Sequence, residues 1–538
     1  MKKTMKFLAL FLVAAMSLSL FAGCHKEQTE TDKVSISYWV GGNPDTMEPG
    51  MTLDSVAEAI LRNTHDPLVR FSNDGKMSYK AAKSHEVSDD GLVYTFHLRE
   101  NAKWSDGKPV LAADFEYGWK RLADPKHICE NAYAFTFLKN GLDVIEGNVP
   151  SSELGVAAVD DYTLRVELES PCNYVLTKFS AGTLLPQRKD ICESDDSWFR
   201  DVSKLGVSNG PFMVSEWELN SKMKLKKNPN YYNADNVKID EIEIPLIADS
   251  NTAFTAYEAG QLDGMLSTPE LKRKIVETPD EVIQIPGVAS ECVLFNTKAH
   301  PFDDIRVRKA FTLAINRPEL IKTKGSLTSK PLASLIPPEI VFDGEELHHV
   351  NENLFGIDLS KSQLDEAKAL MAEAGYPNGE GFPETSILID GSSAGQSLCE
   401  ILCSMWSELG VKVNIHPYED KVFVDMQVAG DYQITETCYG EAAEPFNFLE
   451  TWLPGNGYNT MGFNPPEYEE AFNKATIDPD LTVQKEELLK AEKIFMDGYA
   501  ICPMWYASFS FYQKTYLKGV DYVVDFPLFE NAYIEKAK

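Results

Sequence analysis

The segment GSSAG, residues 391–395, fits the pattern Gly-x-Ser-x-Gly, which in many hydrolases holds a nucleophilic serine on a turn between a strand and a helix. The flanking sequence agrees with that context, because Thr385 to Asp390 is predicted as a strand and Gln396 to Leu409 as a helix. A serine hydrolase also needs an acid and a histidine. His416 is the single histidine after Ser393, and no aspartate lies between them. We therefore expect Ser393 to begin a helix, and keep a secreted hydrolase as an alternative.

Metal chemistry has little support in the sequence. His348 and His349 form the single histidine pair, without the spacing of further histidines or cysteines that a zinc site needs, so a surface loop is predicted there. The 82 acidic residues predict solvated faces and do not single out a catalytic pair. We expect no catalytic residue, no metal and no cofactor.

Nine cysteines are scattered along the chain, and none forms a Cys-x₂-Cys pair. Buried free thiols are favoured for the eight beyond Cys24. A disulfide between Cys292 and Cys438 is kept as an alternative, because such bonds form outside the cell.

Length and charge limit the class of protein. The chain has 538 residues, a formal charge of −31 and 43% hydrophobic residues. Two or three domains are expected at this length, since a single hydrophobic core stops growing near 250–300 residues. The acidic surface would repel nucleic acid, and no basic stripe offsets it.

The N-terminus has the composition of a secretory signal. Basic residues precede a short apolar stretch, Phe7 to Phe21, and then Ala22, Gly23 and Cys24. The stretch is shorter than the roughly 20 residues of a spanning helix. Ala-Gly-Cys resembles a bacterial lipobox, although Phe21 stands where leucine is usual. A diacylated Cys24 would anchor residues 24 onward to a membrane.

A hairpin is predicted between Asn209 and Tyr232. A strand from Phe212 to Trp217 follows an Asn-Gly-Pro turn, and beyond a polar break Met223 and Leu225 alternate with lysines. One face of this hairpin should be core and the other solvated. Further on, strand, helix and strand between 385 and 416 predict an α/β unit.

Several segments, taken in order, resemble a known family: the oligopeptide- and dipeptide-binding proteins of bacterial ABC importers. The similarity runs through nearly all of the chain after the signal. The matching segments are PDTMEP, with Glu48 in place of an aspartate; DDGLVYTFHLRENAKWSDGKPVLAADFEYGWKR; LGVAAVDDYTLRVEL; SNGPFMVSEW; KKNPNYYNADNVKIDEI; YEAGQLD; LFNTKAHPFDDIRVRKAFTLAINRPELI; and EPFNFLETWL.

The resemblance implies a two-lobed α/β fold of the periplasmic-binding-protein type II class, with an extra domain inserted in the first lobe. It places a signal at 1–23 and a linker at 24–32. Lobe I would comprise 33–55, 205–288 and 509–538, the extra domain 56–204, and lobe II 289–508.

The resemblance also implies a function and a site. The chain would capture extracellular oligopeptides between the lobes and deliver them, as a lipid-anchored monomer on the outer face of the cell membrane, to permease and ATPase subunits. Peptide main chain would pair with protein main chain as an added strand. Glu441 is the candidate for the peptide ammonium. Tyr439 and Gly440 would line the cleft, facing Pro44, Asp45 and Thr46 of lobe I.

Two alternatives keep this fold and change the ligand. Relatives that bind oligosaccharides or nickel chelates imply the first, and Trp39, Trp452 and Trp505 could supply the aromatic stacking that a sugar needs. The second is a receptor for signalling peptides.

Overall fold

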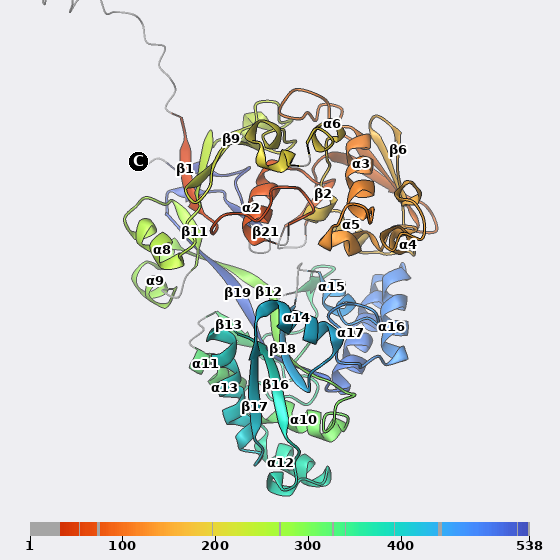
Figure 1. The fold of residues 1–538 in the computed structure, drawn as a ribbon, viewed down its shortest axis with the longest axis vertical. Coiled ribbons are helices and arrows are strands. Elements are labelled where there is room, and N and C mark those ends of the chain that lie inside the picture. Colours follow the sequence, from red (N-terminus) through yellow and green to blue (C-terminus); the bar gives the residue numbers. More distant parts are fainter. Residues whose placement is uncertain are drawn as a thin grey trace, which may run out of the picture.

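The computed structural model describes residues 33–52, 54–72, 76–195, 197–267, 271–324, 328–338, 340–391, 393–439, 444–523 and 526–535. Two lobes lie one above the other in Figure 1, and two long strands run between them. Among the described helices, none is long and apolar enough to cross a bilayer.

One sheet passes through both lobes. Its parallel and antiparallel pairs place β1 between β10 and β11, and β12 between β18 and β19. Its strands, from lobe II to lobe I, are β17 (Val413–Tyr418), β16 (Thr385–Asp390), β18 (Ile434–Tyr439), β12 (Val282–Phe295), β19 (Ile501–Gln513), β11 (Gly264–Leu266), β1 (Ser35–Trp39), β10 (Glu241–Pro245), β9 (Lys222–Lys227) and β8 (Phe212–Glu218), with β13 (Ser329–Pro331) beside β19.

The predicted hairpin forms the outer edge of lobe I. Met223 and Leu225 of β9 are buried, whereas Lys224 lies on the other face near Glu216, Glu241 and Glu243. Alternation along a strand therefore separates core from charge, as the sequence predicted.

Helices cover the sheet in both lobes. Lobe I has α2 (Ser55–Thr64), α8 (Ser250–Glu258) and α9 (Leu271–Glu277). Lobe II has α10 (Ile305–Ala314), α11 (Arg317–Lys324), α12 (Leu364–Glu373), α13 (Ser393–Ser407), α14 (Asp420–Ala429), α15 (Pro445–Glu450), α16 (Pro466–Ile477) and α17 (Leu481–Asp497). The C-terminal segment of lobe I forms two short antiparallel pairs of strands. They are β20 (Leu517–Lys518) with β23 (Tyr533–Ile534), and β21 (Asp521–Val523) with β22 (Phe526–Leu528).

The extra domain is built on a separate four-stranded sheet. The alternating Tyr94, Phe96 and Leu98 of β5 are buried against Phe115 and Trp119 of α3. Its elements are β2 (Val69–Phe71), β3 (Met77–Tyr79), β4 (Ala82–Val87), β5 (Val93–Leu98), α3 (Ala112–Ala123), α4 (Gly141–Ile145), β6 (Val156–Asp160), β7 (Thr163–Glu167), α5 (Val175–Lys178), α6 (Lys189–Cys192) and α7 (Val202–Leu205).

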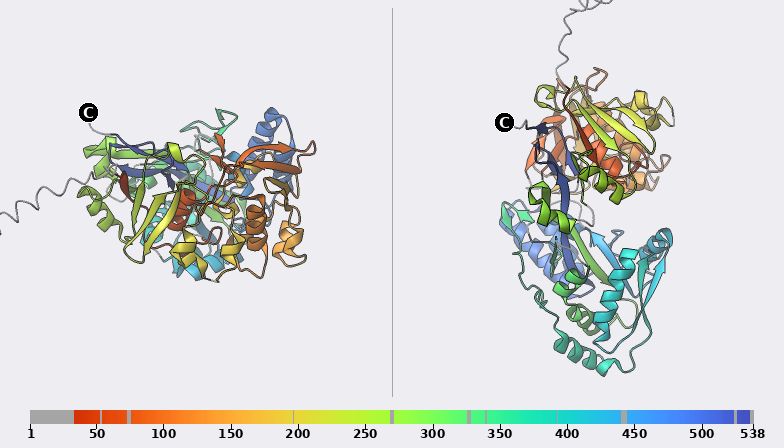
Figure 2. Two further views of the ribbon diagram at one scale, coloured as in Figure 1. Left: turned by 90° about the horizontal axis from the view of Figure 1, so that it is seen from above. Right: turned by 90° about the vertical axis from the view of Figure 1, so that its left-hand side faces the viewer.

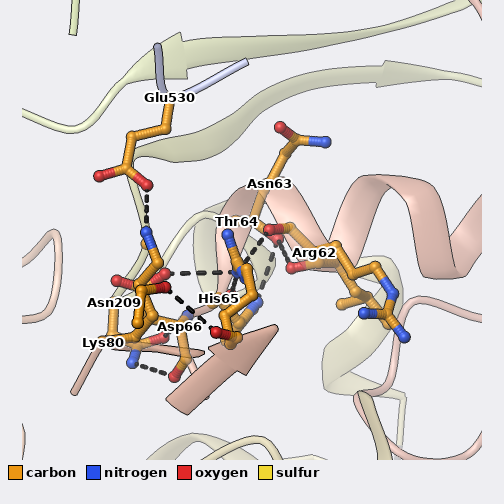
Figure 3. Close-up of polar contacts among 12 residues, drawn as sticks. Arg62, Asn63, Thr64, His65, Asp66, Lys80, Asn209 and Glu530 are labelled. Atoms are coloured by element: carbon orange, nitrogen blue, oxygen red, sulfur yellow. Dashed lines mark hydrogen bonds and ion pairs between the residues drawn. The ribbon is translucent and has the colours of Figure 1, made fainter. Parts of the chain in front are cut away.

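A polar junction holds the chain where it leaves α2 for the extra domain (Figure 3). The backbone N–H of Asp66 donates to Asn209 Oδ1 at 3.1 Å, and Asn209 Nδ2 donates back to the Asp66 carbonyl at 3.0 Å. Lys80 pairs with Glu530 near the C-terminus at 2.5 Å. These bonds tie the extra domain to lobe I through groups far apart in sequence.

Four of the proposed domain limits fall at or inside observed elements, and the one between 204 and 205 divides α7. The limits at 288 and 508 fall inside β12 and β19, because both strands continue from one lobe into the other. The limit at 55 falls at the start of α2, whose apolar residues Val56, Ile60 and Leu61 pack in the core of lobe I. The limits themselves stay a proposal.

Candidate ligand site between the lobes

A cavity of about 1570 Å³ lies between the lobes. One wall comes from the extra domain, including Tyr133, Leu142 and Lys178, with Arg62 of lobe I beside it. The other wall comes from lobe II: α14, the start of α15, and the segment 453–460 that follows it. The short hairpin of β14 (Val341–Phe342) and β15 (Glu345–Glu346) contributes a further edge. Figure 1 shows α14 and α15 at the top of lobe II, directly below the upper half of the molecule.

Glu444 begins α15 and lines this cavity. Its carboxylate accepts a hydrogen bond from the backbone N–H of Asn447 at 3.3 Å, which caps the first turn of the helix. Burial, with a smaller contribution from the nearby Glu450, raises the pKa of Glu444 to about 8. This end of the cavity therefore holds a carboxyl group that is largely protonated at neutral pH.

The extra domain contacts α15 beside the cavity. The rings of Tyr174 and Phe446 stack with centroids 4.7 Å apart and planes 9° apart. Lys178 pairs with Glu450 at 2.7 Å. Asn173 adds two hydrogen bonds to backbone carbonyls just beyond α16 and at its end, which join segments about 300 residues apart. The extra domain and lobe II thus touch directly, apart from the strands that connect the lobes.

The comparisons with known proteins agree on one family. The model for bacterial extracellular solute-binding proteins, family 5, matches residues 76–460. The chain belongs to this family. It is 30% identical over 536 residues to the oligopeptide-binding protein OppA of Bacillus subtilis, covering 97% of each chain. It is 31% identical over 485 residues to the periplasmic oligopeptide-binding protein OppA of Salmonella typhimurium, covering 88% of this chain and 87% of that one.

Solved structures show the same architecture. The murein tripeptide-binding protein MppA in its unliganded open form superposes with a TM-score of 0.79 at 26% identity, covering 94% of this chain and 98% of that one. Haemophilus influenzae OppA in complex with the peptide RPPGFSPFR superposes with a TM-score of 0.75 at 27% identity, covering 94% and 99%. The predicted fold class, two lobes with an extra domain, is confirmed for this solute-binding protein.

Within this frame the predicted lobe II residues divide into two groups. Gly440 and Glu441 lie outside the described residues. Tyr439 ends β18 and is buried, with its hydroxyl donating to the Leu335 carbonyl at 2.7 Å and its ring against Trp452 at 4.8 Å. The ring of Tyr439 is thus packed in lobe II and does not line the cavity. A ligand contact by its main chain stays a prediction.

The predicted lobe I residues lie in a loop with its own hydrogen bonds. Asp45 accepts from the backbone N–H of Thr46 at 2.6 Å and from Thr52 Oγ1 at 2.7 Å, while Pro44 is buried. None of Pro44, Asp45 and Thr46 lines the described cavity. A ligand contact by this loop also stays a prediction.

Glu48, in the same loop, has a structural environment. It is buried between Arg121 and His127 of the extra domain, with which it forms ion pairs. Burial alone would raise its pKa, but the His127 hydrogen bond and the Arg121 guanidinium lower it. Glu48 therefore joins lobe I to the extra domain as a carboxylate.

The prediction of a surface loop at the histidine pair was wrong for His348. Its ring is buried against Glu492, with Nε2 and Oε2 2.5 Å apart, and Glu492 also accepts the backbone N–H groups of Leu335 and Ile336. His349 is exposed. The buried carboxylate draws in one histidine to satisfy its charge, a tertiary requirement that the local sequence does not show.

The tryptophans considered for sugar stacking are also not in the cavity. Trp39, Trp452 and Trp505 are all buried, and the indole of Trp39 donates to the Ile247 carbonyl at 2.9 Å. Each of the three indole rings is packed in the interior of the protein, so none is open for stacking on a ligand.

Strand register separates Cys292 from Cys438. Cys292 is paired with Thr437, and Cys438 with Glu291, across β12 and β18. Directly opposed residues share a face and successive residues alternate, so the two thiols lie on opposite faces of the sheet. A disulfide between them is incompatible with this register.

Glu436 lies on the face that carries Cys438 and Glu291. Burial raises its pKa to about 7, and the neighbouring Glu291 and Asp390 add to the shift. This group could not be recognised from the sequence, because its environment comes from strands about 45 and 145 residues away.

Proposed function

We propose that this chain is the substrate-binding component of an ABC importer that captures extracellular oligopeptides between its lobes and delivers them to a membrane permease. The observation that carries the proposal is the large cavity between the lobes, in a chain that matches oligopeptide-binding relatives over nearly its whole length. A relative of the same fold is described in complex with a nine-residue peptide.

The chemistry of capture follows from what peptides share. An extended backbone buried without partners would be costly, so main-chain groups after β18 pair with the peptide as an added strand. Glu441 takes the peptide ammonium three residues before the helix cap Glu444, and Pro44, Asp45 and Thr46 approach from lobe I when the lobes close. Closure excludes water and strengthens the ion pair, because the local dielectric falls. No bond in the ligand is made or broken, and no cofactor is required.

The location and partners belong to the same proposal. The Ala-Gly-Cys sequence supports a lipid anchor on Cys24, which would hold the monomer at the outer face of the cell membrane beside its permease and ATPase subunits. Mass spectrometry of the N-terminal peptide would show a diacylated Cys24. An unmodified cysteine, or cleavage elsewhere, would contradict the anchor.

The test of capture is calorimetric titration of the chain lacking residues 1–23 with tri-alanine. Glu441→Ala is expected to weaken binding at least tenfold, about 1.4 kcal/mol. The matched control is Glu467→Ala, an exposed carboxylate on α16 that does not line the cavity, which should leave affinity unchanged.

Acetylation of the peptide separates the ammonium from other contacts. N-acetyl-tri-alanine should lose as much affinity for the wild-type protein as Glu441→Ala does, and acetylation should have little further effect on that variant. Equal affinity of free and acetylated peptide would remove Glu441 from this role. Lack of binding by any peptide would reject peptide capture itself.

A further inference from the structure

We propose that the part of the cavity between α14 and the extra domain is an apolar subsite, which binds hydrophobic side chains in the distal half of a long peptide. The inference rests on the proposed function and adds the class of peptide. Four exposed apolar side chains, two on each wall, carry it.

The lobe II wall presents two valines from one face of α14. Val424 and Val428 are one helical turn apart, so their side chains are neighbours on the helix surface. Both line the cavity, and they are 50% and 62% exposed. Val422 is similarly exposed on the same helix, but it does not line the cavity. The helix therefore carries two exposed valines that line the cavity and a third, Val422, that can serve as a control.

The extra domain presents the opposite wall. Tyr133 lines the cavity and is 67% exposed, and Leu142, the second residue of α4, lines it and is 48% exposed. Large apolar side chains left open to water in a cavity commonly mark a ligand-binding surface. Apolar side chains on both walls of one cavity fit a ligand that enters between them.

The charges around this subsite are already paired. Arg62 is bonded to Glu58 at 2.9 Å and lies over the ring of Phe526, and Lys178 is bonded to Glu450. Both basic side chains among the described lining residues therefore have partners. The described lining residues include no unpaired cation, and in a chain with a formal charge of −31 this favours an uncharged ligand group over an acidic one.

Size and position indicate a peptide. At about 1570 Å³ the cavity exceeds the roughly 300–1,000 Å³ of a site for a drug-sized molecule. It reaches Glu444, three residues beyond the proposed ammonium site, so a peptide held at its N-terminus can extend into it. Because the subsite lies between the lobes, a second protein has poor access, whereas an extended chain can thread along it.

The experiment compares three peptides by calorimetric titration: Ala-Ala-Ala, Ala-Ala-Ala-Leu-Ala-Leu and Ala-Ala-Ala-Ser-Ala-Ser. The leucine hexapeptide is expected to bind the wild-type chain at least tenfold more tightly than the serine hexapeptide. The tripeptide measures the N-terminal part of the site alone.

Variants then assign the preference to the walls. Val428→Asp, and separately Leu142→Ser on the other wall, should each reduce affinity for the leucine hexapeptide about tenfold and leave the tripeptide unchanged. Val422→Asp is the matched control and should change neither. All three positions are exposed, so unfolding midpoints should remain those of the wild-type protein.

Three results would overturn the subsite. Equal affinity of the leucine and serine hexapeptides would reject it while peptide capture stands. Equal losses for the tripeptide and the leucine hexapeptide in Val428→Asp would show that the walls contact each other on closure. Failure of all three peptides to bind would reject peptide capture together with its subsite.

Discussion

The lobes are joined in two ways that differ in kind. β12 and β19 carry the backbone from lobe I to lobe II as a paired ladder, which extends from the pair Val282 and Tyr512 to the pair Leu294 and Ile501. The contact of the extra domain with α15, by contrast, consists of side chains: Tyr174 on Phe446, and Lys178 with Glu450. Figure 2 shows the two strands running between the lobes from a second direction.

This difference indicates which joint can open. The ladder shifts register between Ile285 and Ala289 and again between Glu291 and Cys292, but its strands cannot separate without losing many hydrogen bonds. The contact on the other side comprises one ring pair and one ion pair, worth about 1 kcal/mol each, and the two hydrogen bonds of Asn173. Rotation about the strands that breaks the α15 contact is therefore the expected opening motion, in the manner of a hinged domain. Four changes would test the comparison.

The largest effect is expected at the ladder. Arg317 is buried beside β19 and donates from Nε to the carbonyls of Leu332 and Pro503, both at 2.9 Å. Arg317→Met would leave buried carbonyls unsatisfied and should lower the free energy of unfolding by about 2 kcal/mol or more. Urea denaturation measures this. Arg306→Met, at an exposed arginine of α10, is the control, and an equal loss there would contradict the assignment.

A somewhat smaller effect is expected at Glu444, which begins α15, the helix that contacts the extra domain. Its folded pKa is raised to about 8 from a usual 4.5, so the folded state holds the proton where the unfolded state has released it. Its contribution to stability therefore falls as pH rises from about 4.5 to about 8.

Glu444→Gln keeps the helix cap and removes the charge. Relative to the wild-type protein, this variant should gain about 2 kcal/mol between pH 5 and pH 8, after allowance for partial exposure. Urea denaturation at both pH values measures the gain. Glu467→Gln should show no such gain. If the difference in unfolding free energy between Glu444→Gln and the wild-type protein did not change with pH, the raised pKa would be contradicted.

The third change removes the ring pair. Tyr174→Ala should shift the unliganded protein toward an open form by about 1 kcal/mol, roughly fivefold in the ratio of open to closed molecules. X-ray scattering should show a larger radius of gyration for the variant. Phe446→Ala should give a smaller shift, because Tyr174 also contacts the ring of Phe472, and the double variant should add nothing to the shift of Tyr174→Ala. Additive shifts would show that the rings act separately.

The smallest effect is expected from the ion pair. Lys178 and Glu450 are partly exposed, so Glu450→Gln should favour the open form by less than about 1 kcal/mol. The difference from the wild-type protein should shrink as salt rises from 0.05 to about 0.5 M, because the pair is screened. The same scattering experiment in a salt series measures it. A shift insensitive to salt would indicate lost packing.

Local patterns predicted much of the secondary structure. The strand predicted from Thr385 to Asp390 has those limits in the structure, and the buried positions of β5, β9 and α3 follow their alternation or helical spacing. These features depend on neighbours within a few residues, so the sequence shows them directly. The succession of family-like segments likewise indicated the fold, which the comparisons confirm.

The candidate ligand site could be predicted less well from local sequence patterns. Tyrosine is a residue type suited to a ligand pocket, yet the ring of Tyr439 packs in the core of lobe II. His348 is buried because it pairs with the buried carboxylate of Glu492. Neither environment can be recognised locally, because burial depends on which distant segments pack together.

By itself the sequence determined the leader composition, the acidic charge, the alternating strands and the family, because each is written in residue types and short spacings. The tertiary structure alone decided that Tyr174 meets Phe446, that burial raises the pKa of Glu444, and that valines of α14 line one cavity with a tyrosine and a leucine of the extra domain. The two rings, and the two walls of the cavity, are hundreds of residues apart along the chain. The free energy of each contact depends on position and burial, which arise only when the lobes are assembled.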